Sequence, residues 1–419
     1  MATLTAKFAA AAPILFSRPV FTRAATVGDQ LIVAFTNFGL TLAIGRAFSH
    51  TDLASYGIGL SVGLMVQGIQ RHAINIPLML EPEARVQRRM RGALAEQFIV
   101  LACSLIAGAL ALAAASFLSA STYAHLVIAA SVVCLLVYTE LEFARSFLIK
   151  LKRPGVLLAT AVWYAAVAAI AAIGALKHWI GYEALLAILA GAMLVHYAAI
   201  VAVIGVPDLR GGLRLFRMNM NRYGGWAGVA TATYAGYNHL PLLVLGAFAA
   251  PIHAAAFVAT RSLMQPLQIL LRGFDIADKS GFTEGARKKS GGAFALTMKL
   301  ALLYAAIGLL FGVFVWLFAS QILQLAYGTK FIGFETALIA WVPVYILLSV
   351  TMPFESLVYT LKNFRAYYII RGIASLAALA ITFPLVVWFA ETGAIAACAF
   401  GWLIAVTGTA FLLWRSAKV

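Results

Sequence analysis

The sequence predicts an all-α protein that crosses a membrane many times, and three observations carry this prediction. Hydrophobic residues make up 63% of the 419 residues and charged residues only 11%, whereas a soluble domain carries about 25% charged residues. The mean hydropathy is +0.93. Long apolar runs recur along the chain, and ten-residue segments of alternating polarity, typical of a membrane β-barrel, are absent. Because backbone polar groups in lipid must be satisfied within the chain, a helix bundle remains.

About twelve apolar runs are long enough to cross a bilayer, since roughly 20 helical residues cover its ~30 Å hydrocarbon core. The first two runs form a hairpin around the polar turn 49–52. The expected spans are residues 27–48, 53–80, 93–118, 123–149, 155–176, 183–206, 224–249, 252–274, 292–319, 335–361, 366–390 and 392–414.

The second half of the chain restarts like the first, with a long apolar run, a tight turn and a second long run. This layout predicts two six-helix lobes, residues 1–206 and 224–419, with a cavity between them. Residues 207–223 join the lobes. Their apolar and basic residues fall on adjacent helical faces, which fits a basic amphipathic helix on the inner leaflet or an ordinary basic loop. Two glycines, Gly211 and Gly212, weaken the helix prediction.

Basic residues predict that both termini face the cytoplasm. With that orientation, 23 of the 31 Lys and Arg residues fall in inner segments and only 3 in outer turns, with Arg371 assigned to an inner segment. Topology therefore explains most of the net charge of +16, and nucleic acid is not an expected partner. Residues 1–26 fit a cytoplasmic amphipathic segment better than a signal peptide, because Pro13 interrupts a short apolar core.

Three stretches together match one family pattern. The first hairpin carries Asp29-Gln30, Asn37-Phe38, Gly45-Arg46, Asp52 to Gly57 and Pro77-Leu78 in the family's order. Thr139 to Pro154 has the Glu-Phe-x-Arg of a fourth helix, and Ala255 to Phe274 has the Arg of an eighth helix, followed five residues later by Pro. The chain thus resembles Wzx-type polysaccharide flippases of the multidrug/oligosaccharidyl-lipid/polysaccharide (MOP) exporter superfamily.

The resemblance implies a multi-pass protein of the bacterial inner membrane that flips a polyprenyl-pyrophosphate-linked oligosaccharide from the inner to the outer leaflet. Two rocking lobes would achieve this by alternating access, for exopolysaccharide or O-antigen export. The expected partners are the lipid-linked glycan, membrane lipid and the polysaccharide polymerase or export machinery. No cofactor is expected, and a H⁺ or Na⁺ gradient is the candidate driving force.

Two other functions were weighed against this one. The alternative is a MATE-like cation-coupled antiporter for drugs or small molecules, which needs acidic groups in its cavity, whereas the most central charge here is basic. An enzyme is not expected, because no His/Asp or Ser/His/Asp constellation occurs in the loops and the outer turns are short.

Arg261 is the leading candidate for contact with a pyrophosphate. Arginine suits this ligand because its planar fork pairs with phosphate oxygens. Arg261 follows Ile252 by nine residues, roughly 14 Å at 1.5 Å per residue, which places it near the midplane. Sequence neighbours offer no acid to neutralise it, so either it binds substrate or its partner lies on another helix as a carboxylate or a backbone carbonyl.

Other polar residues inside the spans extend this candidate site. Arg71, with Gln67 on part of its face, fits a vestibule wall or a side chain that reaches the inner interface. Arg145 has Glu142 at i−3, which favours an ion pair that locks the helix, although it remains a candidate ligand. Asn37 should face protein or water rather than lipid.

His239 and Tyr234 are candidates for contact with sugar hydroxyls, although a lone buried histidine more often serves packing. Pro241, just after His239, predicts a kink in the seventh span. The candidate ion-coupling carboxylates are Glu355, Glu140, Glu142 and Asp29. Of these, Glu355 follows Pro353 in its span, whereas a helix N-cap is the favoured interpretation of Asp29.

Aromatic residues were assigned to the membrane interfaces. Four tryptophans fit the belts that flank the hydrocarbon core better than a platform for sugars: Trp163, Trp179, Trp316 and Trp341.

Overall fold

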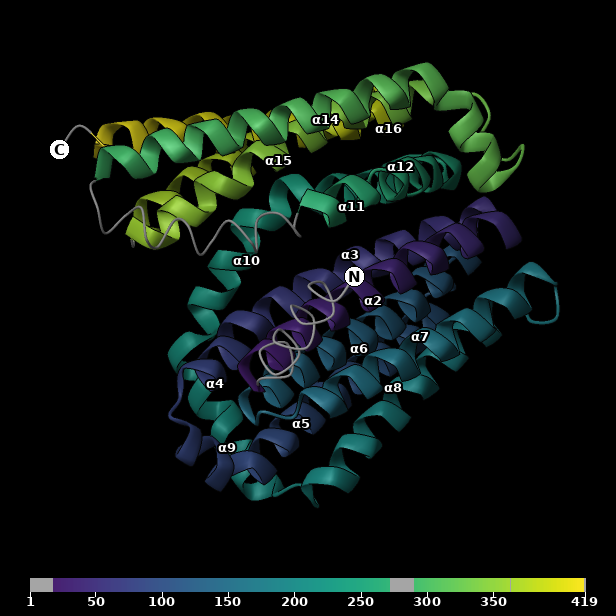
Figure 1. Ribbon diagram of the computed structural model, residues 1–419. Coiled ribbons are helices and arrows are strands. Elements are labelled where there is room, and N and C mark those ends of the chain that lie inside the picture. The colour runs from purple at the N-terminus through teal and green to yellow at the C-terminus, as the bar shows by residue number, and fades with distance from the viewer. Residues whose placement is uncertain (1–17, 272–289, 362, 418–419) are drawn as a thin grey trace, which may run out of the picture. The chain divides into compact units, whose positions relative to one another are not determined.

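The computed structural model describes residues 18–271, 290–361 and 363–417 (Figure 1). Every regular element in this part of the chain is a helix, so the predicted all-α fold class is confirmed. The chain forms two compact units. The first unit comprises Met1–Leu40 and Val66–Ala227, and the second comprises Thr41–Met65 and Gly228–Val419. The predicted N-terminal segment 1–26 lies largely outside the described residues, as does the basic inner loop 275–289.

The first unit is built on the helices that follow the first hairpin. The chain runs through α2 (Arg18–Ala47), α3 (His50–Gln70), the π-helix η1 (Arg71–Asn75), α4 (Ile76–Leu80), α5 (Glu83–Phe117), α6 (Thr122–Lys150), α7 (Pro154–Leu176), α8 (Tyr182–Ile204), α9 (Leu209–Asn219) and the π-helix η2 (Met220–Gly224). Helix α6 packs against α5, α7 and α8. Its buried Phe143 and Phe147 rings stack with centroids 5.1 Å apart in the core of this unit.

The second unit contains α10 (Gly225–Asn238), α11 (Leu240–Phe248), α12 (Pro251–Leu263), α14 (Ser290–Tyr327), α15 (Glu335–Leu361) and α16 (Phe364–Ala417). Helix α15 packs against both α14 and α16 (Figure 1), and α11 packs on α16. Helix α16 contains a kink at Ala390, whose φ is 48°. The two predicted spans 366–390 and 392–414 are therefore the two limbs of this one element.

Eight helices in the described part are long and apolar enough to cross a membrane. Three predicted spans are not among them, because each is interrupted or more polar. Span 53–80 is broken by η1, span 224–249 by a break at His239, and span 252–274 by a break at Met264. The predicted kink before Pro241 is thus confirmed, since proline cannot supply the hydrogen bond that would continue the helix. These three interrupted spans carry Arg71, His239 and Arg261.

Residues 209–219 of the linker form α9, as the amphipathic alternative predicted. Helix α9 lies against α5 (Figure 1). A Cβ on Gly212 would come within 2.4 Å of the Ala95 Cβ, so only glycine permits this approach. The side chain of Asp208 accepts a hydrogen bond from the Gly211 amide at 3.2 Å and caps the first turn. Contact of α9 with a lipid leaflet stays a prediction.

The tip of the first hairpin belongs to the second unit, which differs from the predicted lobe 1–206. Gly57 lies so close to α12 that a Cβ would meet the Val258 side chain at 2.0 Å. The ammonium group of Lys330 donates to the carbonyls of Arg46 and Phe48 at 2.8 and 2.7 Å, which satisfies the carboxyl end of α2. Partial burial lowers the pKa of Lys330, and the nearby Asp52 opposes this shift. The close packing at Gly57 and the cap formed by Lys330 explain why the tip of the first hairpin belongs to the second unit.

Candidate functional site

Five of the predicted site residues meet in the first unit, in a group that we name the Arg145 cluster: Asp29, Gln67, Arg71, Glu142 and Arg145. Arg145 is nearly buried and forms ion pairs with two carboxylates. Its Nε pairs with Asp29, and its Nη1 donates to Glu142 Oε2 at 2.9 Å. The predicted pair Glu142–Arg145 is confirmed. Asp29 lies well inside α2, which begins at Arg18, so its interpretation as an N-cap is wrong.

Glu142 connects the cluster to the interrupted second span. Arg71 Nε lies 3.6 Å from Glu142 Oε1, and Gln67 Nε2 donates to Glu142 Oε2 at 3.4 Å. The Arg71 side chain is 63% exposed, against 17% for Arg145. Two arginines therefore face two carboxylates, and the cluster carries no net charge.

A second polar group in the first unit is fully enclosed. Glu140 is 0% exposed, accepts a hydrogen bond from Gln97 Nε2 at 2.9 Å and lies 3.1 Å from His196 Nδ1. Gln97 in turn accepts one from Gln70 at 2.6 Å. Elsewhere in this unit, Asn37 accepts a hydrogen bond from the Tyr164 hydroxyl at 2.7 Å, so it faces protein, as predicted. Glu140 therefore lies apart from the Arg145 cluster despite its place in the same helix.

Arg261 lies in the last turn of α12 and is half-buried in the second unit. Its Nη1 donates to the backbone carbonyl of Asn238 at 2.9 Å, and its guanidinium carbon lies 5.5 Å from the centroid of the Trp341 ring. Within the described part of the chain, Arg261 forms no ion pair. Of the two partners expected for Arg261, a carboxylate or a backbone carbonyl of another helix, the structure shows the carbonyl. A dipole and a ring face hold the cation without cancelling its charge.

A second arginine of this unit, Arg371 on α16, lies inside an aromatic cage. We name this group the Arg371 cluster, after its members: Tyr234, Tyr237, Glu355, Tyr367, Arg371 and Trp402. The guanidinium carbon of Arg371 lies 4.8, 5.3 and 5.8 Å from the ring centroids of Tyr367, Tyr234 and Trp402. Its Nη2 donates to Glu355 Oε1 at 2.5 Å. The Tyr367 hydroxyl donates to the same oxygen at 2.5 Å.

The predicted sugar contacts His239 and Tyr234 border this cluster. Their rings lie 6.0 Å apart, centroid to centroid, at the break between α10 and α11. His239 is buried, whereas Tyr234 is half-buried. Asn238, which directly precedes His239 in the sequence, supplies the carbonyl that holds Arg261. The break in the seventh span therefore connects the surroundings of both arginines.

Comparison with known proteins gives the fold and no closer relation. No protein-family model matches the sequence, and no curated protein does. A solved multidrug resistance transporter of the MATE family, in an inward-facing conformation, matches with a TM-score of 0.66 over 91% of this chain and 94% of its own, at 13% identity. The lipid II flippase MurJ, in an inward closed conformation, matches with a TM-score of 0.67 over 96% of this chain and 88% of its own, at 13% identity.

A MOP-superfamily transporter from Pyrococcus furiosus, described as having a binding pocket of reverse polarity, also matches, with a TM-score of 0.51, 14% identity and coverage of 96% and 95%. This chain has the fold of MOP-superfamily transporters. The eight helices of the described residues that are long and apolar enough to cross a membrane are consistent with this fold. At these identities the MOP fold is shared, and the substrate is not settled by it.

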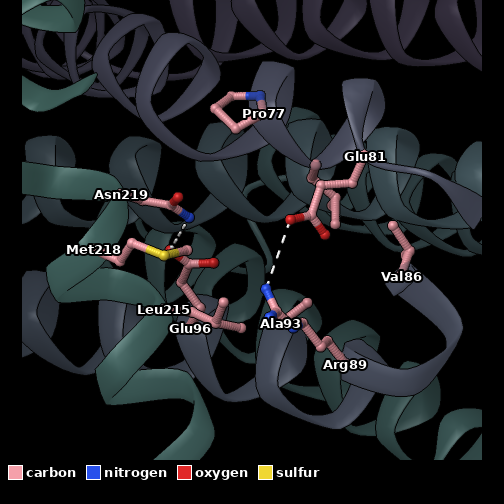
Figure 2. Close-up of a pocket in the computed structure, with 10 residues that line it drawn as sticks. Pro77, Glu81, Val86, Arg89, Ala93, Glu96, Leu215, Met218 and Asn219 are labelled. Atoms are coloured by element: carbon pink, nitrogen blue, oxygen red, sulfur yellow. Dashed lines mark hydrogen bonds and ion pairs between the residues drawn. The ribbon is translucent and has the colours of Figure 1, made fainter. Parts of the chain in front are cut away.

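One small pocket lies in the first unit of this MOP fold, where α4, α5 and α9 meet (Figure 2). Glu96 and Asn219 face each other there, with Asn219 Nδ2 donating to Glu96 Oε1 at 2.9 Å, and Arg89 pairs with Glu81 at 3.7 Å (Figure 2). Its volume of about 30 Å³ admits about one or two water molecules. A sugar does not fit, so this pocket is not the substrate site.

Two residues were misplaced by the sequence-based interpretation. Arg371 was assigned to an inner segment, but it is 8% exposed within α16 and pairs with Glu355. The sequence did contain a signal for the pairing of Arg371 with Glu355. The two residues lie equally far along the sequence from Asn363, at the turn between α15 and α16, so antiparallel helices bring them together. Trp341 was assigned to an interfacial belt, but it is 2% exposed and donates from Nε1 to Thr260 Oγ1 at 3.1 Å.

Proposed function

We propose that this MOP-fold chain flips an anionic lipid-linked glycan, a polyprenyl-pyrophosphate-linked oligosaccharide, from the inner to the outer leaflet by alternating access. The observation that carries the proposal is the charge of Arg261, with which no carboxylate of the described residues pairs. A charged residue near a span centre costs about 2.5–3.5 kcal/mol on insertion scales. A ligand that uses the charge, such as the pyrophosphate, gives a reason for that cost.

The carboxylates support an anionic substrate over the cationic drug of the alternative. A cation antiporter needs a carboxylate that is free to meet its substrate. Asp29, Glu142 and Glu355 are each paired with arginine, and Glu140 is enclosed with His196. A negative group could replace these carboxylates on the arginines, whereas a cation would have to displace the arginines themselves.

The test is flipping in proteoliposomes that contain a fluorescent polyprenyl-pyrophosphate oligosaccharide, measured as headgroup protection from an external quencher. We expect Arg261→Gln to slow flipping by about 10- to 100-fold, because a charge-assisted hydrogen bond of about 1.5–3 kcal/mol is lost. Arg261→Lys should retain part of the rate, since the charge survives and the fork does not.

Arg365→Gln is the matched control, since Arg365 is an exposed arginine of the same unit. It should flip at the wild-type rate. An unchanged rate in correctly inserted Arg261→Gln protein would refute the proposal. Export of cationic dyes, with no flipping of the glycan lipid by the wild type, would select the MATE-like antiporter.

A further inference from the structure

The Arg371 cluster contains hydrogen-bond donors that no described residue satisfies. Arg371 Nε and Trp402 Nε1 are buried without a hydrogen-bond partner in the described part of the chain, and the Tyr237 hydroxyl beside Arg371 is buried as well. Tyr237 and Trp402 have ring centroids 5.0 Å apart, so the donors belong to one cage. An unpaired buried polar group costs about 1–3 kcal/mol. Unpartnered donors gathered in one place indicate a site for an acceptor oxygen.

The charge of the cluster restricts what can enter it. Glu355 and Arg371 together sum to zero, and the rest of the cage is aromatic. An anion added to this neutral pair would leave one uncompensated negative charge in a largely buried place, which is costly. If Glu355 carries a proton, the anion and the guanidinium form the neutral pair instead.

Glu355 is the member of the pair that a proton can reach. Its side chain is 30% exposed, whereas that of Arg371 is 10% exposed. Both of its known contacts end on Oε1, from Tyr367 and Arg371. The charged and titratable groups facing it in the described part of the second unit are Arg371, Tyr367, Tyr234 and Tyr237, with His239 and Arg261 beyond the cage and the exposed Lys299 on the neighbouring α14.

We propose that the Arg371 cluster is a proton-dependent anion site, at which an anionic phosphate oxygen of the substrate replaces Glu355 on Arg371 as Glu355 takes up a proton. The ion pair breaks, the proton goes to the Glu355 carboxylate, and the anion accepts hydrogen bonds from Arg371 and Trp402. Apart from the O–H bond formed on Glu355 by a proton from water, no covalent bond changes. The inference rests on the proposed function, for which it names how an anionic headgroup is held without adding net charge to a buried site: each anionic oxygen bound there is accompanied by one proton on Glu355.

The experiment measures binding of farnesyl pyrophosphate to the full-length protein in nanodiscs between pH 5.5 and 8.5, by quenching of tryptophan fluorescence. Inorganic pyrophosphate and farnesol are the two comparison ligands, which separate the anionic group from the lipid. We expect affinity to rise with falling pH by up to about tenfold per pH unit, the limit for uptake of one proton. Farnesol should bind without this dependence.

Variants assign that dependence to the cluster. Glu355→Gln mimics the protonated acid. It should bind farnesyl pyrophosphate with a weaker dependence of affinity on pH, which then arises only from titration of the ligand itself. Glu391→Gln is the matched control, because Glu391 is a buried acid of the same unit paired with His253 at 2.6 Å, outside the cluster. It should keep the wild-type slope. Arg371→Gln should weaken binding at least tenfold at every pH, and Arg371→Lys should restore part of the affinity.

Two outcomes would overturn the inference. One is a Glu355→Gln protein whose slope equals that of the wild type and of Glu391→Gln. The other is Arg371→Gln protein, folded by its thermal transition, that binds as the wild type does. If Arg371→Gln does not fold, the Glu355→Gln comparison decides alone. If the wild-type protein binds farnesyl pyrophosphate at no pH, the proposed function is refuted as well. If it binds, but Glu355→Gln keeps the wild-type dependence on pH, only the role of Glu355 in proton-dependent binding is refuted.

Discussion

The arginines within the spans have different partners in the two units. In the first unit, Arg145 pairs with Asp29 and Glu142, and Arg71 pairs with Glu142, so cations and anions are equal in number. In the second unit, Arg371 has one carboxylate and Arg261 has a carbonyl and a ring. The first cluster is suited to holding helices together. In the second unit Arg261 has no carboxylate partner among the described residues, which is consistent with the proposed contact with an anion.

The contrast arises from one repeated position. Glu142 in α6 and Glu355 in α15 each lie at the twenty-first residue of the fourth helix of a predicted lobe. Glu142 finds its arginine one turn further along its own helix, and Glu355 finds one on the next helix. The same acid therefore stabilises one helix locally in the first unit and joins two helices in the second.

The sharpest test of this contrast compares the stabilities of Arg145→Gln and Arg261→Gln. Removing Arg145 leaves two carboxylates of low exposure without their main partner, which should lower the free energy of unfolding by about 3–5 kcal/mol. Removing Arg261 strands no acid and should cost about 1 kcal/mol or less. Denaturant titration in mixed micelles measures both. Equal losses would show that the two arginines play the same structural part.

A smaller effect is expected when the Arg371 cluster loses one hydrogen bond. Tyr367→Phe removes the donor to Glu355 and should cost about 1.5–3 kcal/mol, the range for bonds to a charged group. Its neighbour Tyr368 is half-buried, and Tyr368→Phe should stay within about 0.5 kcal/mol. The same titration applies. A Tyr367→Phe protein as stable as its control would mean that Arg371 alone holds Glu355.

The smallest effect concerns the ring beside Arg261. Trp341→Phe removes the bond from Nε1 to Thr260 but keeps an aromatic face for the guanidinium, so we expect a loss of about 1 kcal/mol and flipping close to the wild-type rate. Trp341→Leu removes the face as well and should reduce flipping further. Flipping that is insensitive to both substitutions would show that the ring does not orient Arg261.

The sequence allowed individual local features to be predicted. Arg145 and Glu142, one turn apart on a helix, had to meet, and they do. Pro241 had to break its span, and it does. Arg371 escaped prediction because its place in the chain, near a basic turn, resembles that of residues that face water. Trp341 escaped because a tryptophan at a span end more often lies at an interface.

The sequence by itself determined the fold class, the division into apolar runs and the presence of charge inside them, since hydropathy and helical spacing act over short stretches of chain. Tertiary structure decided which charges are cancelled. Asp29 meets Arg145 and Glu355 meets Arg371 only because helices distant along the chain, or folded back at a turn, bring them within bonding distance. A charge in a low-dielectric interior takes its role from its neighbours, and those neighbours are set by packing.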